Sequence, residues 1–260
     1  MQPTIIITGA SRGLGAATAR IAAGLGANVV LNARAADDLA RVAQAIRDAG
    51  GTALAVAGDV SRAADCEKLV ATAVSEFGRV DAVVNNAGIL EPLARLADAD
   101  PYAWRQNWAV NVLGPLLVTQ AALPYLRAVH GRVINVSSGA AVKAYAGWGA
   151  YCVAKGALNQ FNQVLAMEEA RLTAIAFRPG VVDTAMQSAI RETGADAMTD
   201  ELHAQFMRLH AGGELLPPET PGRALAVLAL YADSAWSGEF LQWDDERVQA
   251  LVARHAPEEK

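Results

Sequence analysis

Three side chains that can move or hold a proton stand close together in the middle of the chain. Tyr151 and Lys155 are four residues apart in WGAYCVAKGAL, and Ser138 ends the run RVINVSS, thirteen residues before Tyr151. Four residues is about one helical turn, so the phenol and the ammonium project from the same face of one helix. The run RVINVSS is typical of a buried strand, which puts Ser138 at the carboxyl edge of a sheet. Together these groups predict proton transfer to or from an oxygen.

The spacing of Tyr151 and Lys155 alone also fits a helix with a solvated lysine and a core tyrosine. Other motifs in the chain decide between this interpretation and a catalytic pair. TIIITGASRGLG begins with an apolar, β-rich run and breaks at Gly9, and glycines return at Gly13 and Gly15 before a helical pattern. A strand, a glycine turn and a helix are the context of a dinucleotide-binding turn. Glycines let the backbone approach a pyrophosphate, and the helix amino terminus offers free N–H groups to it.

Further motifs follow in a fixed order. These are GDV at residues 58–60, NNAG at 85–88, Asn111, Ser138, Tyr151, Lys155 and PGVVDT at 179–184. With TGASRGLG they resemble the short-chain dehydrogenase/reductases over essentially the whole chain. GWGAYCVAKGALNQF, PGVVDTAMQSAIRET and GGELLPPE most resemble the sepiapterin reductase and benzil reductase branch. The resemblance implies one α/β domain over residues 1–260, a doubly wound Rossmann domain.

The elements that would position these motifs alternate along the chain, which predicts a mainly parallel seven-stranded sheet with helices on both faces. We expect strands at Thr4–Ile7, Asn28–Leu31, Thr52–Val56, Ala82–Val84, Arg132–Val136, Thr173–Phe177 and Glu239–Gln242. We expect helices at Gly13–Leu25, Ala36–Ala49, Ala63–Phe77, Pro101–Val129, Gly149–Arg171 and Pro218–Ala232.

The segment Val181–Leu216 interrupts the alternation after the sixth strand. Long excursions at the strand ends of such a sheet usually cover a ligand, so we predict a substrate lid over roughly residues 183–216. A helical insertion without such a role is the alternative.

The end of the second strand predicts which nicotinamide cofactor binds. An acidic residue there would bind the ribose 2′-hydroxyl and repel a 2′-phosphate. VVLNAR instead places Ala33 at that position with Arg34 after it, and Arg12 precedes Gly13. An arginine can hold a phosphate through two charge-assisted hydrogen bonds. The sequence therefore favours NADP(H) over NAD, although both arginines could be ordinary surface residues.

The resemblance also implies a set of cofactor contacts. Asp59 and Val60 would bind the adenine, Asn86 to Gly88 would lie beneath the nicotinamide ribose, and Val182 and Thr184 would approach the carboxamide. The full expected set is Gly9, Ser11, Arg12, Gly13, Leu14, Gly15, Arg34, Asp59, Val60, Asn86, Ala87, Gly88, Tyr151, Lys155, Pro179, Gly180, Val182, Thr184 and Met186.

Four residues carry the implied chemistry, which is hydride transfer between NADPH and a carbonyl carbon. Tyr151 would be the general acid, with a pKa lowered from about 10 by the charge of Lys155. Lys155 would also hold the ribose hydroxyls, and Ser138 would orient the substrate oxygen. Ser137 faces the opposite side if the strand continues and is less favoured. Asn111, in WAVNVLG, matches the family asparagine that holds a water for a proton relay.

The residues expected to contact the substrate are mainly apolar and aromatic, which favours a hydrophobic or aromatic ketone or diketone over a sugar or a charged acid. They are Ser138, Val142, Tyr145, Trp148, Tyr151, Gly180, Phe206 and Trp243. Sepiapterin reductases carry a pterin-anchoring aspartate in the last strand, where GEFLQWDD places Gln242. This departure favours a benzil-like substrate, with sepiapterin-type pterin reduction as the alternative.

Composition limits the remaining possibilities. The chain has 260 residues, 53% of them apolar, 19% charged, and a net charge of −5, so nucleic acid is not an expected partner. Three residues precede the first expected strand, and no apolar stretch was expected to be long enough to span a membrane. Cys66 and Cys152 give no disulfide framework, and no metal site is expected. We therefore expect a cytoplasmic protein.

Two hypotheses of other kinds remain. A non-catalytic NADP-binding regulator should have lost one of the four proton-transfer residues, and all four are present. A catalyst working mainly as an alcohol dehydrogenase differs only in direction, which sequence does not set. The helices Pro101–Val129 and Gly149–Arg171 carry apolar residues on more than one face. In the family such helices pair across a two-fold axis, so we expect a homodimer or homotetramer.

Overall fold

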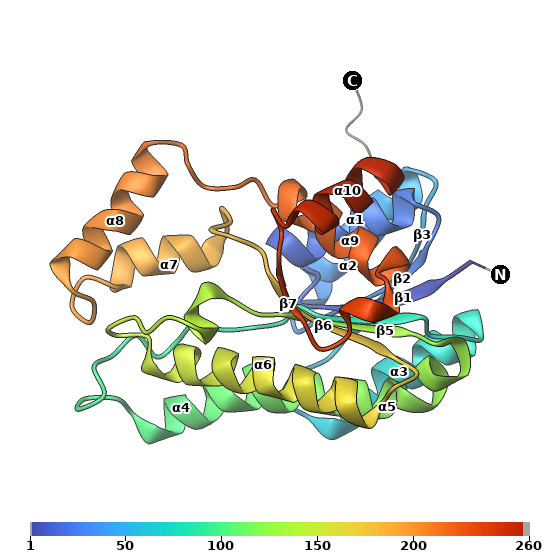
Figure 1. Ribbon diagram of the computed structural model, residues 1–260, viewed down its shortest axis with the longest axis horizontal. Coiled ribbons are helices and arrows are strands. Elements are labelled where there is room, and N and C mark those ends of the chain that lie inside the picture. The colour runs from blue at the N-terminus through green and yellow to red at the C-terminus, as the bar shows by residue number, and fades with distance from the viewer. Residues whose placement is uncertain (1, 257–260) are drawn as a thin grey trace.

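A computed structural model describes residues 2–256, in which all seven strands form one sheet with the order β3-β2-β1-β4-β5-β6-β7 (Figure 1). Every strand pairing is parallel. The strands are β1 (Thr4–Thr8), β2 (Asn28–Ala33), β3 (Thr52–Ala57), β4 (Ala82–Asn85), β5 (Arg132–Val136), β6 (Thr173–Arg178) and β7 (Phe240–Gln242). The strand order reverses between β1 and β4, which is where open α/β sheets bind ligands.

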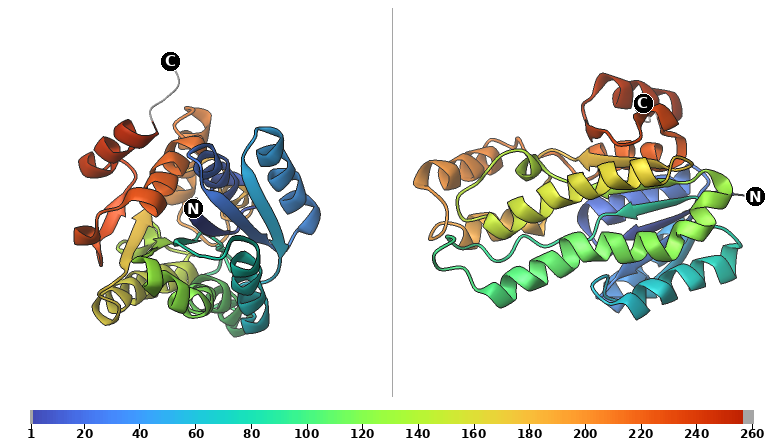
Figure 2. Two further views of the ribbon diagram at one scale, coloured as in Figure 1. Left: turned by 90° about the vertical axis from the view of Figure 1, so that its right-hand side faces the viewer. Right: turned by 60° about the horizontal axis from the view of Figure 1, so that its bottom comes forward.

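Helices cover both faces of the sheet, as the sequence predicted (Figures 1 and 2). On one face lie α1 (Gly13–Gly24), α2 (Ala36–Asp48), α9 (Glu219–Tyr231) and α10 (Glu246–His255). On the other lie α3 (Ala63–Phe77), α5 (Gly114–Val129) and α6 (Gly149–Glu168). The remaining helical pieces are α4 (Pro101–Trp108), the π turn η1 (Ala109–Leu113), α7 (Ala185–Thr193), α8 (Asp200–Ala211) and the short 3-10 turns η2 (Gly139–Ala141) and η3 (Ser234–Trp236).

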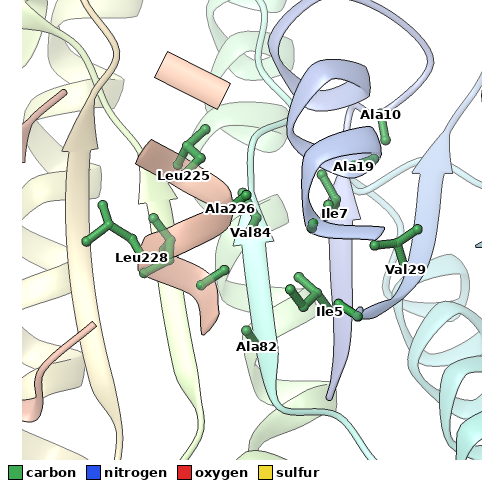
Figure 3. Close-up of a cluster of buried hydrophobic side chains, with 14 of the residues drawn as sticks. Ile5, Ile7, Ala10, Ala19, Val29, Ala82, Val84, Leu225, Ala226 and Leu228 are labelled. Carbon is green, nitrogen blue, oxygen red and sulfur yellow. The ribbon is translucent and has the colours of Figure 1, made fainter. Parts of the chain in front are cut away.

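The alternation of side chains along β1 explains why the sheet needs two helical layers. Ile5 and Ile7 pack on the α1 and α9 side, whereas Ile6 packs on the α3 and α5 side, and all three are completely buried. Figure 3 shows Leu225 and Leu228 of α9 beside the strand that carries Val84, whereas the strand that carries Ile7 lies beneath Ala19 of α1. Because both faces of β1 are covered, its run of isoleucines needs no polar residue.

The longest helical run, α4–η1–α5, corrects one expectation. Pro101–Val129 contains 29 residues and is long and apolar enough, by length and composition, to cross a membrane. In the structure, 44% of an apolar stretch of 18 residues within this run is buried. Val118, Ala122 and Leu126 pack against the sheet. A helix with a sheet on one side and exposed apolar residues on another reaches this hydropathy without a bilayer.

The predicted elements agree with the structure to within three residues at each end, but three helices were not predicted. Two of them, α7 and α8, make up the excursion after β6 and extend beyond the edge of the sheet (Figure 1). The third, α10, follows β7 and packs on α9. The excursion begins and ends at a bridge between Val182 and Leu216.

Candidate functional site

A cleft of about 770 Å³ lies at the carboxyl edge of the sheet, between the glycine turn and the excursion. Every residue expected to contact the cofactor lines it, together with six of the residues expected to contact the substrate, namely Ser138, Tyr145, Trp148, Tyr151, Gly180 and Phe206. Segments that are far apart along the chain therefore meet around one space of the size of a ligand pocket. The described residues contain no group of three histidine, cysteine or acidic side chains that could hold a metal ion.

The glycine turn follows β1 and packs tightly against the NNAG segment. Gly9 has φ +65°, a left-handed conformation that favours glycine. A Cβ atom on Gly15 would lie 2.5 Å from Nδ2 of Asn86, so a larger residue there would not fit. The same Nδ2 donates to the carbonyl oxygens of Thr8 at 2.9 Å and Gly9 at 3.2 Å. Asn86 thus fixes the turn, a role that its motif alone did not indicate.

The amino terminus of α1 opens onto this cleft and suits an anion. The N-cap residue Arg12 makes no side-chain capping bond, and the first turn of α1 carries no acidic residue. The first N–H groups of the helix are therefore not satisfied by a cap, and the positive end of the helix dipole is not neutralised. Gly13 and Leu14 line the cleft beside them. This arrangement fits the diphosphate of a dinucleotide.

The end of the cleft near β2 is rich in arginine. Arg12 and Arg34 line it, and a smaller adjoining cavity of about 330 Å³ is lined by Arg12, Arg20 and Arg41. Asp38 also lines both spaces and is paired with Arg41. Four arginines against two carboxylates, those of Asp38 and Asp59, give this end a net positive charge. The sequence had indicated only two of the four arginines, Arg12 and Arg34.

Asp59 lies after β3 near the same end of the cleft. Its Oδ1 atom accepts hydrogen bonds from the backbone N–H and the hydroxyl of Ser61, at 2.9 and 2.7 Å. Burial tends to raise the pKa of Asp59, but these hydrogen bonds and the charges of Arg34 and Arg62 hold that pKa below its ordinary value. The carboxylate is thus ionised at neutral pH and available as an acceptor.

Tyr151 and Lys155 lie on one face of α6 and are both buried, at 7% and 3% exposure. Lys155 Nζ lies 5.5 Å from the centre of the Tyr151 ring and donates a hydrogen bond to the Val136 carbonyl at 2.7 Å. That bond uses one of its three donors. Two donors remain for groups in the cleft.

The pKa values of this pair differ from the expectation for Tyr151. Burial raises the pKa of Tyr151 to about 12, while hydrogen bonding with Ser138 lowers it in part. Burial also lowers the pKa of Lys155 to about 8. Both charged forms lose solvation in this site, and this effect outweighs the attraction that we expected to lower the tyrosine pKa. Without a bound cofactor, Tyr151 therefore carries its proton at neutral pH and can act as a proton donor.

The two serines after β5 have different partners. The Ser137 hydroxyl donates to Oδ1 of Asn159 on α6 at 2.6 Å. The Ser138 hydroxyl accepts from the N–H of Ala140 at 3.1 Å, as the cap of η2, and interacts with the phenol of Tyr151. Ser138 therefore shares a location with the proton donor, whereas Ser137 joins β5 to the helix. This placement agrees with the preference for Ser138.

Asn111 does not line the cleft but lies directly behind it, fully buried in the π turn η1. Its Oδ1 atom accepts from the N–H of Ile89 at 3.1 Å, and its Nδ2 atom donates to the carbonyl of Ile89 at 2.8 Å. The side chain therefore holds the segment after NNAG in place. A π turn inside an α-helix often marks a functional position.

The end of the cleft beyond Tyr151 is bounded by aromatic rings. Trp148 stacks on Phe206 of α8 with ring centres 5.3 Å apart, and it lies against Tyr145 with centres 4.9 Å apart and the ring planes tilted by 31°. The Trp148 ring meets Tyr151 edge-on at 6.1 Å. The excursion thus supplies one wall next to the proton donor, and this wall favours flat apolar groups.

Two expected substrate contacts lie elsewhere. Val142 follows η2 and is 70% exposed, outside the cleft. Trp243 packs against the hydrophobic core on the α9 side, because Trp243 N–H donates to the Arg178 carbonyl and continues the β7 pairing. Sequence reasoning missed Gln187 and Ile190 of α7, which do line the cleft. Gln187 and Ile190 are three residues apart in AMQSAIRET. This spacing puts both side chains on one face of a helix, which could have indicated that they share a site.

Comparisons with known proteins agree with this geometry. A family model described as short chain dehydrogenase matches residues 3–195. A benzil reductase of Saccharomyces cerevisiae that forms (S)-benzoin is 36% identical over 200 residues, covering 73% of this chain and 76% of that protein.

Two solved structures are also similar. A short-chain dehydrogenase/reductase from Saccharomyces cerevisiae superimposes with a TM-score of 0.92 and 33% identity, over 96% of this chain and 99% of the other. An alcohol dehydrogenase from the archaeon Thermococcus sibiricus, complexed with 5-hydroxy-NADP, has a TM-score of 0.78 and 27% identity, over 93% and 96% of the two chains.

Proposed function

Because the chain belongs to the short-chain dehydrogenase/reductase family, and so is an oxidoreductase that acts on CH–OH or C=O groups, we propose that it is an NADPH-dependent reductase of hydrophobic or aromatic ketones and diketones. The observation that carries the proposal is the wall of Tyr145, Trp148 and Phe206 beside the buried phenol of Tyr151. An aromatic carbonyl compound can stack on this wall while its oxygen reaches the phenol.

Each residue at this end of the cleft has a defined role in the proposed reaction. The cofactor that these residues would hold, NADPH, would supply the hydride for the carbonyl carbon. Ser138 hydrogen-bonds the carbonyl oxygen and orients it toward Tyr151, which donates its proton to that oxygen. Lys155 directs its remaining donors to the ribose hydroxyls and supports the tyrosine when it has lost its proton. Trp148 and Phe206 exclude water from the reacting carbonyl.

The preference for NADPH over NADH rests on charge. Arg12 and Arg34 line the end of the cleft that would receive the adenosine, and no acidic residue ends β2, where Ala33 stands. A 2′-phosphate there gains charge-assisted hydrogen bonds that a 2′-hydroxyl cannot make. The relative complexed with an NADP derivative supports the same choice.

The test is the rate of NADPH oxidation with a panel of carbonyl compounds: benzil, isatin, simple aliphatic ketones, quinones and sepiapterin. We expect benzil or isatin to be reduced with the highest kcat/KM. A clear preference for sepiapterin would favour the pterin alternative, in which Gln242 would have to serve in place of an aspartate. In the structure Gln242 instead accepts a hydrogen bond from Arg178 at 2.9 Å.

A further inference from the structure

Asn107 lies in the last turn of α4 and is completely buried. Its Nδ2 atom lies within hydrogen-bonding distance of three successive carbonyl oxygens, those of Ile89 at 3.2 Å, Leu90 at 3.3 Å and Glu91 at 2.7 Å. Its Oδ1 atom accepts a hydrogen bond from Nδ2 of Asn111 at 2.8 Å. One side chain therefore contacts three residues of a loop and the amide of Asn111 at once.

The loop depends on this side chain for its hydrogen bonds. Residues 88–91 continue the chain beyond β4 without joining the sheet. Among residues 2–256, no backbone N–H reaches the carbonyl oxygens of Ile89, Leu90 or Glu91. A buried carbonyl that finds no donor is costly, so the amides of Asn107 and Asn111 replace the ladder that a strand would provide.

The loop and Asn111 meet the catalytic lysine at a single place. A Cβ atom built on Gly88 would lie 2.9 Å from Asn111 Oδ1 and 3.7 Å from Lys155 Nζ. Ala87, Gly88 and Ile89 line the cleft, whereas Asn107 does not. A small movement of the loop would therefore change the space beside Lys155 without any change in Lys155 itself.

We propose that Asn107 is a positioning residue that holds Asn111 and the loop 88–91 against Lys155. It touches neither cofactor nor substrate and acts through Asn111 and the loop. This inference rests on the proposed function for its catalytic readout, and it adds a residue that lies outside the four proton-transfer positions. The i, i+4 spacing of the two asparagines, at the entry to the π turn η1, lets both amides face the same loop.

A double-mutant cycle tests the inference. Asn107→Leu, Asn111→Leu and the double variant are compared by kcat for the best ketone and by the Kd for NADPH, measured from cofactor fluorescence. We expect Asn107→Leu to lower kcat by about 10- to 100-fold, as misplacement of a site does. The kcat of the double variant should lie within about twofold of the kcat of the less active single variant, because the two residues act as a unit. Losses that multiply, or no loss in Asn107→Leu, would overturn the inference.

Two further variants keep the test decisive. Asn107→Thr retains one donor and one acceptor, so it should recover part of the kcat lost in Asn107→Leu, and it serves as the test if the leucine variant does not fold. Asn162→Leu removes another completely buried amide, which bonds to Asn135 and to the Ala174 carbonyl and does not line the cleft. It should lower Tm but leave kcat within about threefold. An equal loss of kcat in Asn162→Leu would mean that general destabilisation explains the effect.

The proposed function and this inference can fail separately. If the wild-type protein reduces no ketone, the proposed function fails, and the NADPH-binding arm of the cycle still tests Asn107. In that arm Asn107→Leu should raise the Kd for NADPH by several-fold, and the double variant should again match the weaker single variant. An unchanged Kd would then overturn the role of Asn107.

Discussion

Lys155 Nζ lies 5.5 Å from the centre of the Tyr151 ring, and both side chains are buried on the same face of α6. The tyrosine can therefore hold a proton at neutral pH while the lysine lies close enough to support its loss. The lysine is fixed by its bond to the Val136 carbonyl, so the pair does not depend on solvent for its geometry.

Removing the phenolic oxygen should abolish turnover without loss of the fold. We expect Tyr151→Phe to lower kcat for ketone reduction by about 10²- to 10⁴-fold, because proton donation to the carbonyl oxygen is lost. The Kd for NADPH should change little. Steady-state kinetics and cofactor fluorescence measure the two effects, and near-wild-type turnover would exclude Tyr151 as the donor.

The buried lysine should give a pH-dependent stability. Its pKa is about 8 in the folded protein and 10.5 in the unfolded reference, so the unfolded state binds more protons between those pH values. The free energy of unfolding therefore gains from this group as the pH rises from about 8 to about 10.5. Below pH 8 the buried charge costs at most about 3 kcal/mol.

Denaturant unfolding of wild type and Lys155→Met, without cofactor, checks this prediction. Lys155→Met should be the more stable below pH 8, and the difference should shrink as the pH rises toward 10.5. Lys143→Met, a change at an exposed lysine, controls for the loss of a surface side chain. A difference that stays constant over this range would show that Lys155 is not buried as described.

Reversing the charge at Arg34 should change the cofactor preference. We expect Arg34→Asp to lower the ratio of kcat/KM for NADPH to that for NADH by at least about tenfold, since a charged hydrogen bond is worth about 1.5–3 kcal/mol. Arg62→Asp is the matched control, because Arg62 also lies near Asp59 but does not line the cleft. Equal ratios in the two variants would place Arg34 outside the phosphate site.

The contact between the excursion and α6 should matter for substrate more than for cofactor. Phe206→Ala removes the ring that stacks on Trp148 and should raise the KM for an aromatic ketone by about tenfold. The Kd for NADPH should stay within about twofold. Met207→Ala, at a half-exposed neighbour that does not line the cleft, should leave both unchanged. Equal losses for ketone and NADPH would contradict a substrate lid.

The exposed apolar residues at the end of η1 and along α6 predict self-association. Leu113, Val153, Val164 and Met167 are 41%, 51%, 41% and 85% exposed. Sedimentation at micromolar concentration should give at least twice the chain mass of 27.2 kDa. Val153→Asp combined with Val164→Asp should lower that mass to a monomer, whereas Val142→Asp, at another exposed valine, should not. A monomeric wild type would refute the prediction.

The sheet and its motifs could be predicted because each strand is a short apolar run that ends in a glycine or a polar turn. The glycine turn, Ser138, Tyr151 and Lys155 met at one cleft for the same reason: parallel strands bring their carboxyl ends to one edge. The positions of Val142 and Trp243 could not be predicted in the same way. Whether a side chain in a loop or at a strand end faces the cleft depends on local hydrogen bonds, which the sequence does not show. Asn107 carried no sequence signal, since its partners are backbone carbonyls of a distant loop.

The bridge at the base of the excursion has an evolutionary consequence. Leu216 N–H donates to the Val181 carbonyl at 2.8 Å, and Asp183 N–H donates to the Leu216 carbonyl at 2.9 Å, so the two ends of the excursion are held side by side. Closing a longer or shorter loop between fixed ends changes its entropy only slowly with length. The segment between residues 183 and 216 can therefore change in length and sequence during evolution. Such changes would alter the substrate that binds while the proton-transfer residues stay in place.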